Sequence, residues 1–144
     1  GMAARGLWPP ADTPDLEEAE SPITGWRGWA WDGEVLHGYR VPWESSELVA
    51  ICTLAHEAPE WACTCGIYAI KEPVPATWTH ISARGRVEMW GTVIEHEDGY
   101  RASHARITDL WVDHDEALFL DLTVRYPDVR VWMGSYNEPR EEDK

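Results

Sequence analysis

All the cysteines of the chain lie within a fourteen-residue segment that also contains a histidine. The segment CTLAHEAPEWACTC spaces these residues as C-x3-H-x6-C-x-C. Three thiolates and one imidazole make a complete tetrahedral ligand set for Zn²⁺. The sequence therefore predicts a metal site, with Zn²⁺ as the candidate cofactor and with Cys52, His56, Cys63 and Cys65 as its ligands.

Other interpretations of this segment stay open. Reduced cysteine is often buried like a small apolar residue, so the thiols could simply belong to the core. A disulfide from Cys52 to Cys63 or to Cys65 is another alternative. Four protein ligands would close a metal site, whereas three ligands and a water would make it catalytic. A reactive cysteine would need a base such as His56 or His104.

The clearest regular element is a hairpin over residues 86–95 and 100–108. Asp98-Gly99 is typical of a two-residue hairpin turn, and the side chains of a strand alternate between its two faces. With that turn, one face is predicted to enter the core and to carry Trp90, Ile94 and Ile107. The other face also includes Met89 and Val93, and we predict it as a candidate binding face built from Glu95, Tyr100, His104 and Arg106.

The remaining pattern predicts one α+β domain over residues 23–136, built on an antiparallel sheet with one or two helices. Residues 1–22 are rich in proline and acid and are predicted to form a mobile arm, and residues 137–144 a charged tail. Strands are expected over 25–31, 35–43 and 129–133, a strand or a helix over 48–54, a short element over 66–70 and a short helix over 75–82. A longer helix is expected over 113–125, with Asp113 or Asp115 as its N-terminal cap and Pro127 as the residue that ends it.

The net charge of −14 comes from 26 acidic and 12 basic side chains. Such a charge repels phosphate and anionic lipid, so we expect neither nucleic acid nor a membrane as a partner. A basic strip around Arg101 and Arg106 on the hairpin is the one feature that would oppose this. The sequence shows no signal-peptide core and no apolar run near the roughly 18 residues of a membrane span. We therefore predict a cytoplasmic protein with reduced thiols.

The chain contains ten tryptophans and one phenylalanine. Large aromatic side chains mostly fill cores, and some line binding surfaces.

Several short motifs of the chain also resemble a family of bacterial proteins, common in actinobacteria, that has no established function. The family has a CxCGIYA segment followed by a VxLWG strand and a GYRA strand, and the chain has CTCGIYA at 63–69, VEMWG at 87–91 and GYRA at 99–102. The resemblance implies that the cysteine segment and the hairpin form one unit, and it implies no reaction.

These observations favour a small binding or adaptor module. In this interpretation a bound zinc ion holds the cysteine–histidine loop together and supplements a small core. The tryptophan-rich surface is expected to contact a protein or a small molecule. The first alternative is an enzyme that uses a cysteine or an open metal site with His56 or His104 as acid–base. The sequence shows no phosphate-binding glycine loop or other catalytic signature, which favours a protein that is not an enzyme. The second alternative is an acidic mimic that binds a basic partner.

Overall fold

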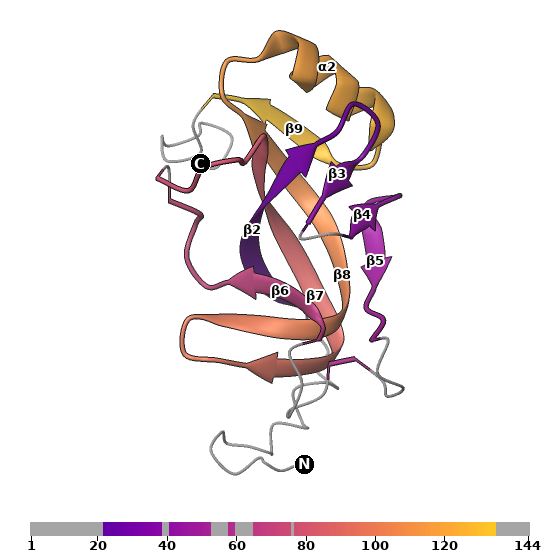
Figure 1. Ribbon diagram of the computed structural model, residues 1–144, viewed down its shortest axis with the longest axis vertical. Helices are drawn as coiled ribbons and strands as arrows, with labels where there is room; N and C mark the ends of the chain where they lie inside the picture. The colour runs from indigo at the N-terminus through magenta and orange to yellow at the C-terminus, as the bar shows by residue number, and fades with distance from the viewer. Residues whose placement is uncertain (1–21, 39–40, 53–57, 60–64, 76, 135–144) are drawn as a thin grey trace.

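A computed structural model describes residues 22–38, 41–52, 58–59, 65–75 and 77–134. This part of the chain forms one body with one helix and a sheet of eight mostly antiparallel strands, which confirms the predicted α+β class (Figure 1). The elements are β2 (Ile23–Trp31), β3 (Leu36–His37), β4 (Pro42–Trp43), β5 (Glu47–Val49), β6 (Ile67–Ile70), β7 (Ala83–Glu95), β8 (Gly99–Val112), α2 (Glu116–Arg125) and β9 (Arg130–Met133). The predicted tail, and the predicted arm up to residue 21, lie outside the described residues.

The sheet is assembled around β8. One edge of β8 pairs with β7, and the other edge is occupied in turn by β6, β5 and β9. β9 runs parallel to β8, because α2 carries the chain back before β9 begins. β2 pairs with β7 and, at Trp26–Ile70, also with β6. The strands β2, β7, β8 and β6 therefore close into a ring.

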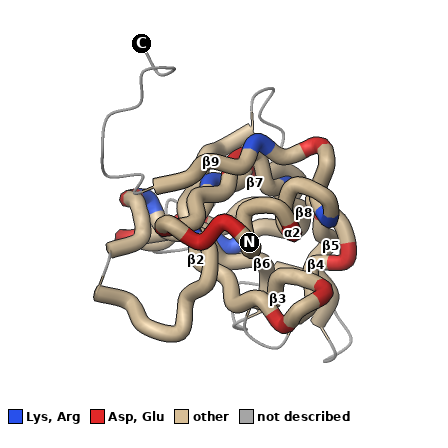
Figure 2. The backbone as a smooth tube through the Cα atoms, turned by 90° about the horizontal axis from the view of Figure 1, so that it is seen from above, with Lys and Arg blue, Asp and Glu red and all other residues tan. Residues whose placement is uncertain are grey.

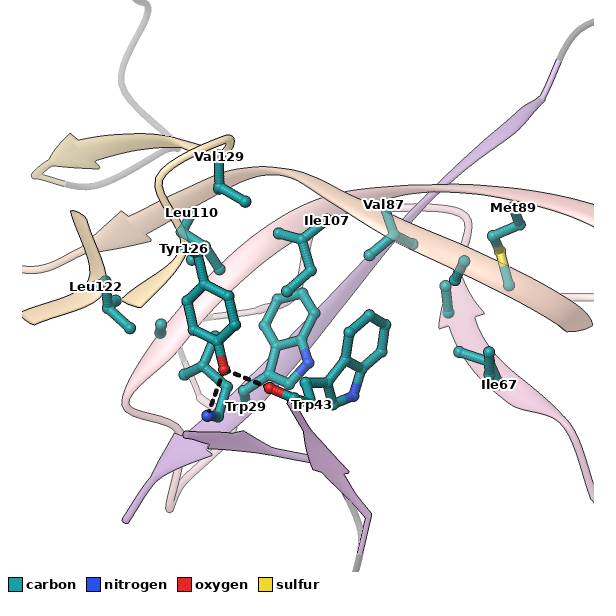
Figure 3. Close-up of a cluster of buried hydrophobic side chains, with 14 of the residues drawn as sticks. Trp29, Trp43, Ile67, Val87, Met89, Ile107, Leu110, Leu122, Tyr126 and Val129 are labelled. Atoms are coloured by element: carbon teal, nitrogen blue, oxygen red, sulfur yellow. Dashed lines mark hydrogen bonds between the residues drawn. The ribbon is translucent and has the colours of Figure 1, made fainter. Parts of the chain in front are cut away.

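The core lies between the curled sheet and α2 (Figure 3). Trp29 and Trp43 are fully buried and meet edge to face with their ring centroids 5.6 Å apart. The Tyr126 hydroxyl donates to the carbonyl of Trp43 over 2.7 Å and accepts the Leu36 N–H over 2.8 Å. One buried phenol at the end of α2 therefore ties this helix to β3 and β4, which are distant from it in sequence.

The prediction for α2 is confirmed, with Asp115 as the cap. Its carboxylate accepts the backbone N–H of Leu118 over 3.0 Å, which satisfies a donor at the start of the helix. Leu118 and Leu122 face the core, and the helix ends before Pro127. The predicted strand over 35–43 is divided into β3 and β4, which pair with each other, and the Gly38 N–H bonds to the Val41 carbonyl. Among the described residues of 75–82 no helix forms.

The β7–β8 hairpin is confirmed, but its predicted register is wrong. Glu95 pairs with Tyr100, and the His96 N–H bonds to the Gly99 carbonyl over 2.7 Å, so the turn is Glu97-Asp98. Gly99 instead lies where β6 crosses closely, because a Cβ there would come within 2.5 Å of the Ala69 carbonyl oxygen. This glycine permits strand contact and does not form the turn.

The predicted core face of the hairpin is also partly wrong. Ile107 is buried as expected, but Trp90 and Ile94 are only half-buried, whereas Met89 and Val93 are buried. The register shifts between Trp90 and Val93, and within this bulge Gly91 has φ 85°, a conformation that other residues rarely adopt. The bulge changes which β8 residues β7 meets on each side of it.

Candidate functional site

The predicted metal ligands are described only in part. His56 and Cys63 lie outside the described residues. Cys52 and Cys65 are both half-buried, and no disulfide joins the two. Within the described part of the chain, no group of three or more His, Cys, Asp or Glu side chains is placed to hold a metal ion. The metal assignment therefore stays a prediction.

The two stems of the cysteine segment leave and rejoin the sheet at adjacent residues of β8. The Ala50 N–H bonds to the Ser103 carbonyl over 2.8 Å, after which the chain departs from β8. It returns at Ile67, which pairs with Ala102. Consecutive Cα atoms are about 3.8 Å apart, so the base of the segment 51–66 is closed. Cys52 and Cys65 each lie two residues beyond these anchor points.

Arg101 fastens the second stem to β8. Its side chain is 3% exposed, and its Nη1 donates to the Cys65 carbonyl over 2.9 Å. Its Nε donates to Nε2 of His96 over 3.0 Å. Desolvation, followed by the positive charge of Arg101, lowers the pKa of His96. The imidazole is therefore held as a neutral acceptor beside the guanidinium.

Pro59 connects the middle of the segment to the same place. Ala58 and Pro59 are buried, and Pro59 packs against Gly66, which Arg101 also contacts. Gly66 has φ 116°, a backbone conformation that residues other than glycine rarely adopt. The described parts of the segment therefore fold back onto one point of β8.

The predicted binding face is divided between the two sides of the sheet. Glu95 and Tyr100 pair two residues beyond the buried pair Val93–Ala102 and so share its side. They form a small group in which Lys71 donates to Glu95 over 2.6 Å and lies over the Tyr100 ring at 5.5 Å.

His104 and Arg106 lie on the opposite, outer side. His104 pairs with Trp90, and their rings stack 5.6 Å apart. Arg106 pairs with Glu88 and forms an ion pair with it. The placement of four residues on one face is therefore wrong, because the bulge at Gly91 separates the two pairs. Their binding role stays a prediction.

A second cluster on the outer side was missed by reasoning from sequence. Asp109 is fully buried, and its Oδ1 accepts from Arg86 Nη2 over 2.9 Å and from Arg130 Nη2 over 3.1 Å. Its Oδ2 meets Arg130 Nε at 3.0 Å and accepts Trp132 Nε1 over 3.0 Å. Desolvation by burial raises the pKa of Asp109. The hydrogen bonds from Trp132, Arg86, Thr108 and Arg130 outweigh this desolvation, so the pKa of Asp109 is lowered. The carboxylate is therefore ionised and holds two guanidinium groups in place.

Indole rings surround this carboxylate. The Arg86 guanidinium lies 5.5 Å from the ring centroid of Trp26 and 5.9 Å from that of Trp111. Trp111 in turn stacks on Trp132 at 6.4 Å. Strand pairing places Arg84 beside Trp111 on the same side. We call this surface the arginine–tryptophan face, which consists of Trp26, Arg84, Arg86, Asp109, Trp111, Arg130 and Trp132.

A sequence signal for this face did exist. Arg84 and Arg86 are two residues apart on a strand, which puts them on one face, and Asp109 is an acid inside the apolar run of β8. What the sequence lacks is the pairing across β2, β7, β8 and β9 that brings them together.

Comparisons with protein-family models, with curated proteins and with solved structures found no match. No helix in the described part of the chain is long and apolar enough to cross a membrane. The function is therefore argued from the chemistry of the two places on β8, the cysteine segment and the arginine–tryptophan face.

Proposed function

We propose that the chain is a small binding module that presents the arginine–tryptophan face to a partner and carries a zinc-stapled loop beside it. The observation that carries this proposal is the fixed set of cations and indoles on one side of the sheet. Arg130 is 65% exposed although Asp109 holds its guanidinium. Arginine and tryptophan are the side chains that most often dominate the binding energy of protein interfaces.

Partner capture tests the binding role. Trp132→Ala with Arg130→Ala removes the exposed part of the face, and Leu120→Ala on α2, where Leu120 is 61% exposed, is a matched surface control. We expect a protein of the source organism's lysate to be retained by the parent chain and the control, and to be lost with the double variant. Equal retention by all three chains would count against the face.

The zinc part of the proposal is supported by the closed base of the cysteine segment. Anchoring at Ser103 and Ala102 brings the two stems together, and the contacts of Pro59 and Arg101 shorten the remaining path. A loop closed in this way loses less chain entropy when four ligands converge on one ion. We propose Cys52, His56, Cys63 and Cys65 as that ligand set, in a protein of the cytoplasm, where thiols stay reduced.

Metal analysis of protein purified without chelator tests the zinc site. We expect about one Zn²⁺ per chain, no thiol reaction under native conditions, and loss of the metal in Cys63→Ser and in His56→Ala. His114→Ala is the control, because His114 is 82% exposed and distant in sequence from the loop. A metal-free chain with all three thiols titratable after denaturation would leave only buried thiols. Missing thiols would indicate a disulfide.

The enzyme alternative makes a different prediction for the same ion. Cobalt substitution reports the ligand count, since an open site keeps a water and a closed site has four protein ligands. A cobalt spectrum that shows no contribution from a bound water would favour the structural role. The alternative of an acidic mimic is weakened by the arginine–tryptophan face, which offers cations on a chain of net charge −14.

We also propose, on the three motifs alone, that the chain is a member of the actinobacterial family that it resembles.

A further inference from the structure

The chemistry of the partner is indicated by the hydrogen-bond donors of the arginine–tryptophan face. Arg86 directs Nε and Nη2 to Asp109, and Arg130 does the same. In the described part of the chain these two guanidinium groups have no further hydrogen-bond acceptor. Each guanidinium carries five N–H donors. The Nη1 groups of both arginines are therefore left for an anion from outside.

Asp109 makes these donors rigid. A fully buried carboxylate held by two guanidinium groups and an indole N–H fixes the plane of each arginine. Trp26 and Trp111 pack against the guanidinium of Arg86. An arginine that is ordered before binding loses little entropy on contact, and its fork matches the two oxygens of a carboxylate or a phosphate.

The local charge of the face has the opposite sign to that of the chain. Arg86 and Arg130 share one carboxylate, Asp109, and Arg84 lies on the same side of the sheet, which leaves a local excess of positive charge. Figure 2 shows basic residues along β7, β8 and β9 with acidic residues interspersed among them, and further acidic residues near β3 and β5. Arg84 is at the border, since it also lines an open groove of about 480 Å³ with Asp113, Asp115 and Asp121. The excess of positive charge therefore comes mainly from Arg86 and Arg130.

We infer that the arginine–tryptophan face binds a short acidic segment of a protein partner, whose carboxylates bridge Arg86 and Arg130. This inference rests on the proposed function. A nucleic acid has the same anionic chemistry, but its continuous row of phosphates meets the full repulsion of a chain with charge −14. A short acidic segment meets less electrostatic repulsion from the rest of the chain, because charges beyond about 8 Å are screened at physiological salt. The flanking indoles also suit a protein interface.

Titration of the full chain with three probes tests the inference: a ten-residue glutamate peptide, a ten-nucleotide deoxythymidine strand and a ten-residue lysine peptide. Tryptophan fluorescence and calorimetry report binding at about 150 mM salt. We expect saturable binding of the glutamate peptide only. Binding of the thymidine strand in preference to the glutamate peptide would overturn the inference in favour of nucleic acid, and binding of the lysine peptide alone, or of no probe, would overturn it outright.

Two variants locate the binding. Arg130→Ala should weaken binding of the glutamate peptide at least about ten-fold, because it removes a charge-assisted hydrogen bond to the peptide. Arg106→Ala is the matched control, because Arg106 is an exposed arginine of the neighbouring strand β8 that is already paired with Glu88. Equal weakening by both variants would show only a diffuse charge effect and would overturn the assignment.

Arg130→Lys keeps the charge but removes the fork, and we expect it to bind nearly as weakly as Arg130→Ala while it unfolds at the parent's temperature. Parent-like binding by this variant would contradict the bidentate geometry. If a partner is captured but the glutamate peptide does not bind, the proposed binding role is retained and the inference of an acidic partner is overturned. If both fail, the proposed function falls as well.

Discussion

The two ends of β8 each contain a buried charge, and the two charges are held in different ways. Asp109 is surrounded by two guanidinium groups and an indole N–H, and it fastens β9 and β7 to β8. Arg101 donates to a backbone carbonyl and to a neutral imidazole, and it fastens the cysteine segment. Both residues act as attachment points for elements that are distant in sequence.

The difference lies in what each attachment point exposes. At Asp109 the partners are cations whose side chains are partly exposed, 35% for Arg86 and 65% for Arg130, so the cluster forms part of the surface. At Arg101 the cation itself is 3% exposed, and its contacts hold the chain beside Cys65. One strand therefore supports an exposed cluster of cations and indoles at one end and the base of a closed segment at the other.

The largest effect is expected at Asp109. Asp109→Ala leaves Arg86 and Arg130 without their carboxylate and should lower the free energy of unfolding by about 3–5 kcal/mol, as is typical when one member of a buried ion pair is removed. Urea denaturation measures it. Glu88→Ala breaks the more exposed pair with Arg106 and should cost about 0–1 kcal/mol. Equal losses in the two variants would remove the distinction between a buried and a surface charge.

The next effect tests which side of the hairpin faces the core. Met89→Ala should cost about 2–5 kcal/mol, because Met89 is fully buried. Trp90→Ala should cost less, about 1–2 kcal/mol, since this half-buried ring mainly stacks on His104. A thermal or urea unfolding series that gives the larger loss for Trp90, about 3–5 kcal/mol, would instead support the face predicted from sequence.

A smaller loss is expected at the other end of β8. Arg101→Met fills a similar volume but leaves the Cys65 carbonyl without its donor, which should cost about 1–3 kcal/mol. The same variant should expose the cysteine segment, so thiol labelling under native conditions should accelerate. Lys71→Met, which removes a surface donor to Glu95, is the control. Unchanged labelling in Arg101→Met would separate Arg101 from the loop.

The smallest effects distinguish the two ends by pH. The pKa of His96 is lowered in the fold, so the unfolded chain binds the proton first and stability falls as the pH drops from about 6.5 towards the folded pKa. The pKa of Asp109 is also lowered, so its contribution is complete above the unfolded pKa of about 3.9 and is lost as the pH falls through the folded pKa. Urea unfolding at a series of pH values should show both steps.

Two conservative variants assign the steps. His96→Gln should remove the step that begins as the pH falls below about 6.5, and Asp109→Asn the step that begins below about 3.9. The variants are compared with the parent at each pH, so that a uniform loss of stability does not hide the step. If a step persists in its own variant, another group causes it.

Several features follow from local sequence alone. The helix after β8 is set by the Asp115 cap, by the apolar residues Leu118 and Leu122, and by Pro127, all within a few residues of one another. The existence of the hairpin and the closing strand β9 follows from alternation in the same way. The proximity of the cysteines to one histidine is likewise a property of spacing, and their metal role is still a prediction.

The tertiary structure decided the hairpin register, the side of each residue and the arginine–tryptophan face. Gly99 looks like a turn residue in sequence, yet the approach of β6 requires it in the strand, and the turn moves to Glu97-Asp98. The bulge at Gly91 then divides Glu95 and Tyr100 from His104 and Arg106. These outcomes depend on contacts between segments far apart in the chain, whose energies a local pattern does not contain. Asp109 shows this most clearly, because its partners come from β7 and β9 and meet only when β8 lies between them.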